Sequence, residues 1–284
     1  MGRTGLIKSG SHSKPRRPAG DTVAALARGI AVLRCFGEGT GTLSHGDIAR
    51  QTHIPKPTLT RLVATLETLG LLRQAAESDR YTLAAGVLPL ARAYLAGLDV
   101  RARARPHMMA LADELDASVY LAVCEPPEMV VIEACRSRSN ALTSRLDIGS
   151  RVPLALSAIG RAYLAALDEP AREALIRTLR ARAGNAWRKE ASGLERALRD
   201  ASLRGYCVSL GESHPDISAA AVSLLTPSGE IMSLNCGGPS FRFTEETLRR
   251  RVAPRLRVAA ERIAADIGGT TAGIPPLPRL VASA

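Results

Sequence analysis

The chain has 284 residues, enough for two domains or one large one, and its hydrophobic content of 46% is sufficient for real cores. Aromatic residues make up only 3%, too few for a surface that stacks the bases of RNA or single-stranded DNA. The formal net charge of +11 favours a polyanionic partner without saying which one.

The cysteines are odd in number and include no closely spaced pair: Cys35, Cys124, Cys135, Cys207 and Cys236. This predicts free or buried thiols in a reducing cytoplasm, not a metal site or a disulfide framework. The sequence has no long uncharged apolar run and no signal-peptide core, so we expect a cytoplasmic protein with no membrane segment.

Residues 1–20 carry basic side chains and no acid, amid glycine, serine and proline. This composition predicts a disordered basic arm that adds nonspecific affinity for DNA phosphates. A tail without a role, or a misassigned start codon, is an equally good interpretation. A first helix is predicted over 21–36, where Val23, Leu26, Ile30 and Leu33 have helical spacing and should pack under the two helices that follow.

A short helix, a tight corner and a second helix are predicted over 44–51, 52–55 and 58–69. Ser44 and Asp47 fit a capping pattern at the start of the first of these helices. The second helix has an apolar face made by one set of residues: Leu59, Leu62, Val63, Leu66 and Leu69. Its opposite face holds short or basic side chains and no acid: Thr58, Thr60, Arg61, Ala64, Thr65 and Thr68. Such a face is able to enter a major groove without repelling phosphates.

A two-stranded wing is predicted directly after that helix, from 71–74 and 80–83 around a polar turn. The whole unit then reads as a winged helix-turn-helix. An ordinary amphipathic helical hairpin is the alternative, and the wing favours DNA binding over it. The predicted DNA-contacting residues lie at the start of the first of these two helices, on the second helix or just before it, and on the wing: Ser44, Lys56, Thr58, Thr60, Arg61, Thr65, Arg73 and Arg80.

A helix apolar over much of its circumference is predicted over 84–98. Arg101, Arg103 and Arg105 follow, and their spacing of two suggests a solvated hinge instead of one helical face. A short helix over 107–116 comes next.

From Ser118 the pattern changes to strands interrupted by helices, which indicates an α+β domain. Strands are predicted at 119–124, 129–135, 141–146, 206–210, 217–226 and 231–236. Helices are predicted at 157–167, 169–179, 193–204 and 244–267, the last with a kink at Pro254. Residues 269–284 should be a frayed tail.

Several separated motifs resemble the IclR family of bacterial transcription regulators. They are the runs 25–33, 43–51 and 54–62, the wing, the loop and helix over 149–165, Arg204-Gly205-Tyr206 with Gly211-Glu212, and 236–239. The resemblance implies an α+β protein of two domains: a winged helix-turn-helix over 21–84, a linker helix over 85–99 that helps to dimerise the DNA heads, and a GAF or PAS-like effector-binding domain over 100–269. It also implies a homodimer or a dimer of dimers. Composition predicts the disordered ends at 1–20 and 270–284.

The resemblance also implies an effector pocket between the sheet and the helix that starts near Ser157. The residues that match the family's ligand contacts are Ser157, Ala158, Ile159, Ser209, Ala219, Asn235 and Gly237. The founding member's pattern has an acid at the Ser209 position and a cysteine at the Ala219 position. Their absence here favours a larger, aromatic or branched carboxylic acid, which a helix N-terminus is suited to bind. The alternative is that these residues only complete a packed core.

No catalytic, metal-binding or cofactor-binding motif is found. The predicted function is a ligand-responsive regulator that binds double-stranded operator DNA of a catabolic operon. An enzyme with a helical regulatory domain is the rival, with Cys207 or Cys236 as its reactive residue. A protein-interaction adaptor is a third possibility, which the acid-free, arginine-bearing helix face opposes.

Overall fold

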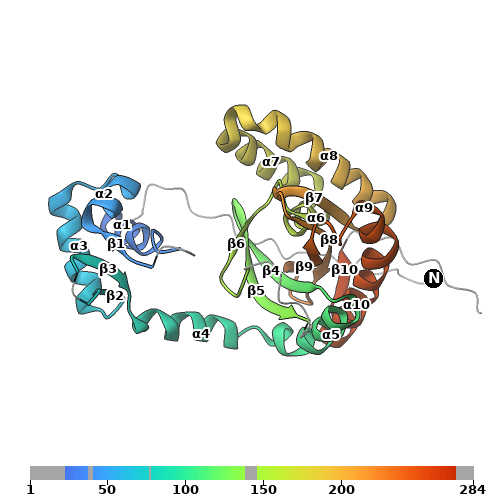
Figure 1. Cartoon of the computed structure of the whole chain (residues 1–284), viewed down its shortest axis with the longest axis horizontal. Coiled ribbons are helices and arrows are strands. Elements are labelled where there is room, and N and C mark those ends of the chain that lie inside the picture. Colours follow the sequence, from blue (N-terminus) through green and yellow to red (C-terminus); the bar gives the residue numbers. More distant parts are fainter. Residues whose placement is uncertain (1–22, 38–40, 77, 138–145, 273–284) are drawn as a thin grey trace, which may run out of the picture. The chain divides into compact units, whose positions relative to one another are not determined.

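The computed structural model describes residues 23–37, 41–76, 78–137 and 146–272 and divides the chain into two compact units, Met1–Gly97 and Leu98–Ala284 (Figure 1). The predicted arm at 1–20 and the possible strand residues 141–145 lie outside the described residues. The prediction of an α+β protein with an N-terminal winged helix-turn-helix is confirmed.

The first unit is a small helical domain with a wing. Its elements are α1 (Ala24–Leu33), β1 (Leu43–Ser44), α2 (His45–Thr52), α3 (Lys56–Thr68), β2 (Leu72–Gln74), β3 (Arg80–Leu83), the 3₁₀ turn η2 (Ala85–Val87) and α4 (Leu88–Ala96). The wing is a three-stranded antiparallel sheet in the order β1-β3-β2. The sequence did not reveal β1, because two residues are too few to show a period.

The core of the first unit joins α1, α2, α3 and the three strands of the wing. Its buried residues are Val32, Leu43, Ile48, Ile54, Leu59, Val63, Leu66 and Leu72. The predicted inner face of α3 is confirmed for Leu59, Val63 and Leu66. It is wrong for Leu69, which caps the helix and is 63% exposed, because the chain turns away there at Gly70 in the left-handed conformation.

The predicted packing of α1 is confirmed for Leu33, which packs against this core, and is wrong for the other three residues. Val23 and Leu26 are 69% and 67% exposed, and Ile30 is exposed as well. The buried residues of α1 are Gly29 and Val32, and together with Leu33 they form the face through which α1 meets the core. Helical spacing identifies an apolar stripe, but not whether that stripe packs within the chain or against another molecule.

The second unit is an antiparallel sheet in the order β10-β8-β9-β4-β5-β6, with β7 also paired to β8. Its strands are β4 (Ser118–Glu125), β5 (Glu128–Arg136), β6 (Arg151–Pro153), β7 (Cys207–His214), β8 (Ile217–Leu225), β9 (Ile231–Pro239) and β10 (Thr270–Ala272). Its helices are α5 (Asp99–Leu115), α6 (Ala158–Ala166), α7 (Glu169–Ala183), the 3₁₀ turn η3 (Gly184–Ala186), α8 (Trp187–Arg204), α9 (Glu245–Thr247), the π-helical turn η4 (Leu248–Val252) and α10 (Ala253–Ile267).

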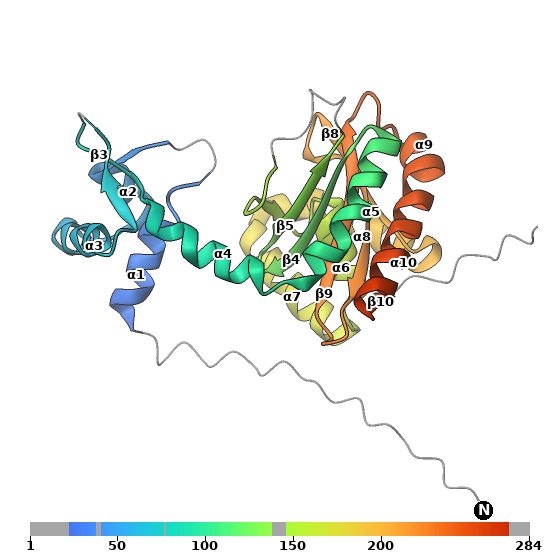
Figure 2. The same ribbon diagram turned by 90° about the horizontal axis from the view of Figure 1, so that it is seen from below.

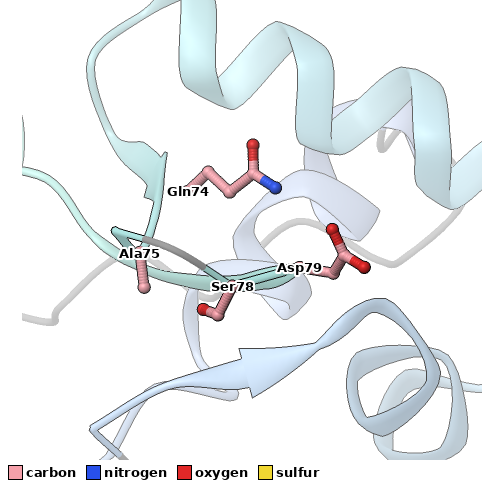
Figure 3. A pocket seen from close by; sticks show the side chains of 4 residues that line it. All are labelled: Gln74, Ala75, Ser78 and Asp79. Carbon is pink, nitrogen blue, oxygen red and sulfur yellow. The ribbon is translucent and has the colours of Figure 1, made fainter.

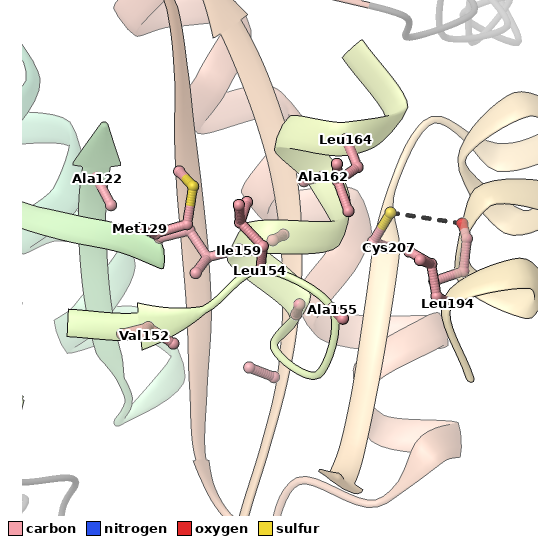
Figure 4. Packing of buried hydrophobic residues seen from close by; sticks show 14 of the residues in the cluster. Ala122, Met129, Val152, Leu154, Ala155, Ile159, Ala162, Leu164, Leu194 and Cys207 are labelled. Carbon is pink, nitrogen blue, oxygen red and sulfur yellow. Dashed lines mark hydrogen bonds between the residues drawn. The ribbon is translucent and has the colours of Figure 1, made fainter. Parts of the chain in front are cut away.

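Helices cover the sheet on both sides. Neighbouring helices α5 and α10 pack on one face, and α6 with α7 and α8 lies on the other (Figures 1 and 2). Figure 4 shows the core on the α6 side, which brings Met129 of β5 together with Ile159 and Leu164 of α6 and with Leu194 of α8. This arrangement, with one helix laid against the middle of an antiparallel sheet, is the GAF or PAS-like architecture that the resemblance implied.

Two predictions about the second unit are corrected. The segment with Arg101, Arg103 and Arg105 is not a solvated hinge, because all three residues lie in α5 and Pro106 is accommodated inside that helix. Residues spaced by two do not share a helical face, but Arg101 and Arg105 are spaced by four and do. The predicted frayed tail begins with a strand, because Gly268 adopts the left-handed conformation and turns the chain back so that Thr270–Ala272 pairs with β8.

Smaller differences concern element ends. Helix α8 begins at Trp187, six residues before the predicted start. Pro254 lies in the first turn of α10. The irregularity expected at this proline is a π-helical turn that ends just before α10 begins. The short strand β6 was not predicted.

Candidate DNA interface and effector site

Helix α2 begins with a complete capping box. The Ser44 Oγ accepts a hydrogen bond from the Asp47 backbone N–H at 3.1 Å and donates one to Asp47 Oδ2 at 2.8 Å. The Ser44 backbone N–H also donates to Asp47 Oδ2, at 3.1 Å. The two bonds that the Ser44 hydroxyl and N–H donate to this carboxylate, and then the Arg50 guanidinium, lower the pKa of Asp47 to about 2. The Ser44 hydroxyl, predicted to contact DNA, is therefore engaged within the chain, and its direct effect is to fix the start of α2.

The face of α3 opposite the core is polar and open. Lys56, Thr60, Arg61 and Thr65 are exposed, and Thr58 is half-buried. Thr60 Oγ1 donates to the Lys56 carbonyl at 3.0 Å, and Thr65 Oγ1 donates to the Arg61 carbonyl at 2.8 Å. With their protons used in this way, the threonines present methyl groups and acceptor oxygens outwards. Contact with a thymine methyl or a base amino group suits such a surface.

One further residue of this surface was missed by the sequence reasoning. His45 lies at the start of α2, and its Nε2 is 3.2 Å from Thr60 Oγ1 of α3. The sequence offered one signal for His45, which is its position. It is the first residue of α2 after the cap, at the end of that helix that lies next to α3.

The two wing arginines differ in their surroundings. Arg73 lies exposed on β2. Arg80 donates from Nε to Thr42 Oγ1 at 2.9 Å and from Nη2 to the Thr42 carbonyl at 2.8 Å, and it also reaches Asp47 Oδ2 at 3.3 Å. Arg80 therefore ties β3 to the segment that starts α2, in addition to any contact with DNA.

The tip of the wing is not basic. Figure 3 shows a shallow depression lined by Gln74, Ala75, Ser78 and Asp79. Among these four residues the one charged side chain is Asp79, which would repel a phosphate. Positive charge on the wing comes from its strands instead.

In the second unit, the predicted effector residues lie on the sheet face covered by α6 and at the start of α6. Ser209, Ala219 and Gly237 are in register across β7, β8 and β9. Asn235 lies two residues before Gly237 on the same face, opposite Ala221. Ser157 caps α6, and Ala158 and Ile159 in its first turn are buried in the core on this side of the sheet.

Most of these groups are already satisfied internally. Ser157 Oγ accepts from the Gly160 N–H at 3.1 Å and donates to the Pro153 carbonyl at 2.6 Å. Ser209 Oγ donates to the Leu156 carbonyl at 2.8 Å. The exception is Asn235, whose Oδ1 is buried and has no hydrogen-bond partner among the described residues. A buried polar atom of this kind is rare unless a ligand or water completes it.

Two glycines keep this region close-packed. A Cβ at Gly160 would collide with the backbone of Leu154, and a Cβ at Gly237 would collide with the Ser218 carbonyl and Ala219. The missing side chain at Gly237 thus lets β8 and β9 approach each other, which is a different role from contacting a ligand.

A buried ion pair joins two motifs that the sequence left separate. Arg161 of α6, only 1% exposed, donates from Nη1 to Glu212 Oε2 of β7 at 2.6 Å and to the Val208 carbonyl at 3.2 Å. Burial alone would raise the pKa of Glu212, but the hydrogen bond and charge of Arg161 outweigh it and the net pKa is lowered. A Cβ at Gly193 would strike both side chains, so α8 passes them only with a glycine there.

The residues proposed for a rival enzymatic function are not arranged as reactive groups. Cys207 and Cys236 are fully buried. Burial raises the pKa of Cys207 to about 12, and it raises the pKa of Cys236 as well, so both are thiols and weak nucleophiles at neutral pH. His214 and Asp216, a polar pair outside that proposal, are exposed, with His214 Nδ1 4.0 Å from Asp216 Oδ2. Within the described ranges no cluster of three or more histidine, cysteine or acidic residues is placed to hold a metal.

The described helices differ from membrane-spanning ones in length and hydropathy. None of them is both long enough and apolar enough to span a bilayer.

Comparison with known proteins accounts for both units. Residues 92–265 match the model of the bacterial transcriptional regulator IclR C-terminal domain, and residues 25–76 match that of the IclR helix-turn-helix domain. The transcriptional regulator TsaQ1/TsaQ2 of Comamonas testosteroni is 32% identical over 248 residues, covering 86% of this chain and 88% of that protein.

Solved structures of IclR-family proteins are similar to this chain over most of its length. An IclR family transcriptional regulator from Brucella abortus is 41% identical with a TM-score of 0.78, covering 86% of this chain and 93% of that one. An IclR homologue from Microbacterium hydrocarbonoxydans, complexed with 4-hydroxybenzoate, is 24% identical with a TM-score of 0.68, covering 86% and 99%. The chain belongs to the IclR family of bacterial transcriptional regulators, proteins that bind DNA through a helix-turn-helix domain.

Proposed function

We propose that this protein regulates a catabolic operon by binding double-stranded operator DNA through α3 and the wing, with an affinity set by a small carboxylate bound on the α6 side of the second unit. The observation that carries the proposal is α3 itself. Leu59, Val63 and Leu66 are buried on one face, while Lys56 and Arg61 are exposed with the threonines on the other. The family points to a regulator and away from an enzyme.

A homo-oligomer is part of this proposal, either a dimer or a tetramer. Exposed apolar side chains lie on two helices of the first unit: Leu26 and Ile30 of α1 with Val23 just before it, and Leu88, Leu90 and Tyr94 of α4. A second copy of the chain would cover these stripes, and a two-fold pair of heads matches a pseudo-palindromic operator. Such a regulator works in the cytoplasm, at the nucleoid when bound to DNA.

Two features support a carboxylic acid as the effector. The backbone at the start of α6 offers a positive dipole end near Ser157 and Ala158. The buried Asn235 Oδ1 requires a hydrogen-bond donor, which a hydroxyl on the ligand would provide. The 4-hydroxybenzoate complex of the Microbacterium homologue agrees with an aromatic acid carrying such a hydroxyl.

Replacing Arg61 with alanine should weaken binding to the cognate operator by about 1–3 kcal/mol and binding to random DNA much less, if its guanidinium reads a base. The Arg73→Ala variant is the matched comparison. It removes an exposed cation from the wing, so we expect it to weaken binding to both DNAs alike and to lower the salt slope by about one.

The measurement is a titration of the protein's own promoter region, and of a scrambled fragment, at several salt concentrations. Equal loss on both fragments for Arg61→Ala would show that α3 is not the reading helix. Arg80 is unsuitable for this comparison, because removing it also releases the wing from Thr42.

A saturating carboxylic-acid effector should raise the melting temperature of the protein and change its affinity for the operator. At a hundred times its Kd, a ligand stabilises the folded state by about 2.7 kcal/mol. A thermal-shift screen that includes 4-hydroxybenzoate, repeated with operator DNA, tests this. Asn235→Leu should abolish the shift, whereas Asn185→Leu, the same change at an exposed site, should not. A shift that persists fully in Asn235→Leu would exclude Asn235 from the site.

A further inference from the structure

Glu133 of β5 is an almost fully buried carboxylate held between two arginines of α5. Its Oε2 is 3.0 Å from Arg101 Nη2, and its Oε1 is 2.7 Å from Arg105 Nη1. The side chain of Glu133 is 3% exposed, while Arg105 is 55% exposed. The same carboxylate accepts the N–H of Ala134 at 3.1 Å, which fixes it relative to its own strand.

The placement of these arginines is unfavourable for the helix by itself. Arg101 lies in the first turn of α5, where the helix dipole favours acids, and Arg103 and Arg105 follow in the second turn, which adds further positive charge near the same end. Arg103 is offset by Asp99, at 2.7 Å, and donates to the Asp266 carbonyl of α10 at 3.0 Å. The start of α5 is thus attached to the sheet by Glu133 and to α10 by Arg103. The first unit ends at Gly97, one turn before Arg101.

A β-bulge turns Glu133 towards α5. The pairing of β4 with β5 shifts between Leu121 and Ala122, so Glu133 lies opposite Leu121 while Val131 lies opposite Ala122. Residues spaced by two normally share a sheet face, but the extra residue Ile132 puts these two on opposite faces.

Strand β5 therefore contacts both sides of the unit. Met129 and Val131 belong to the core that contains Ala158 and Ile159 of α6. Two residues further on, the same strand holds the α5 arginines through Glu133. A displacement of β5 by the α6-side core therefore moves the carboxylate that holds Arg101 and Arg105, in addition to the surface on which α5 packs.

We propose that Glu133 is a positioning residue that couples the effector-side core to the start of α5, and so to the linker that leads into the DNA-binding unit. The proposal rests on the proposed function, because it assigns a route to the effector response. A purely structural ion pair would stabilise the second unit without passing on changes made at α6.

A thermodynamic cycle in the full-length protein separates these two roles. Ile159→Val removes one methyl from the α6-side core and acts as the probe. We expect it to change operator affinity by about threefold or more in the otherwise wild-type protein, and by less than about 1.5-fold in a Glu133→Gln background. The matched control is Glu128→Gln, the same change on the same strand, whose carboxylate pairs with Arg151 of β6 and not with α5. In that background the effect of Ile159→Val should persist in full.

Amide hydrogen exchange provides a second measurement. Glu133→Gln should lower the protection of residues 98–105 by about tenfold or more, and Glu128→Gln should leave it unchanged. The proposal is overturned if Ile159→Val acts equally in the wild-type and Glu133→Gln backgrounds, if it has no effect in either, or if protection at 98–105 is unaltered. Failure of the wild-type protein to prefer its operator over a scrambled fragment removes the proposed function, and this proposal with it. Loss of coupling alone leaves the proposed function intact.

Discussion

Replacing Glu212 with glutamine is expected to lower the free energy of unfolding of the second unit by about 3–5 kcal/mol at neutral pH. The reason is that the Arg161 guanidinium remains buried, at 1% exposure, after its counter-charge is removed. The cost should fall towards the lower end of that range, because the Glu212 side chain is 24% exposed and water can approach the variant site.

The stability difference between wild type and Glu212→Gln should depend on pH. The pKa of Glu212 is lowered in the folded state, so the carboxylate stabilises the fold at pH values above its unfolded pKa of about 4.3. That contribution is lost as the pH falls through the lower folded pKa. The difference between wild type and Glu212→Gln should therefore be full near neutral pH and shrink in acid.

Urea unfolding of both proteins, followed by circular dichroism at several pH values, measures this difference. Glu195→Gln, at an exposed position of α8, is the control and should change stability by less than about 0.5 kcal/mol. A Glu212→Gln protein as stable as the control would mean that the pair is not needed to keep Arg161 buried.

Leu59→Ala should destabilise the first unit by about 2–5 kcal/mol and remove operator binding along with it. Leu59 is fully buried at the centre of a small core that holds α3 against α1 and α2. A core of this size has little stability to spare, so a cavity at its centre should unfold a large share of the DNA-binding unit.

Leu69→Ala is the matched control, since it is the same change at an exposed residue that caps the same helix. It should alter stability by no more than about 0.5 kcal/mol. Calorimetry separates the melting of the two units, and titration of the operator reports binding. If Leu59→Ala melted like Leu69→Ala, the packing assigned to α3 would be wrong.

The sequence by itself determined the local elements of the DNA-binding unit. The cap at Ser44 and the apolar spacing of α3 are properties of neighbouring residues, and both helices form as predicted. The effector-domain hairpin of β8 and β9 was equally visible, because two strand-forming runs separated by the turn at Gly229 are local signals.

Which partner each surface meets was decided only by the tertiary structure. The stripe of α1 has perfect helical spacing, yet Val23 and Leu26 are exposed, since the spacing does not tell an internal core from an external partner. The arginines before Pro106 looked like a hinge, because Glu133, the charge that holds two of them, is 28 residues away from Arg105 in the chain. Arg161 and Glu212 are 51 residues apart, and their pairing exists only because α6 lies against β7. Periodicity and capping act over one or two turns, whereas burial and ion pairing join residues that only the complete fold brings into contact.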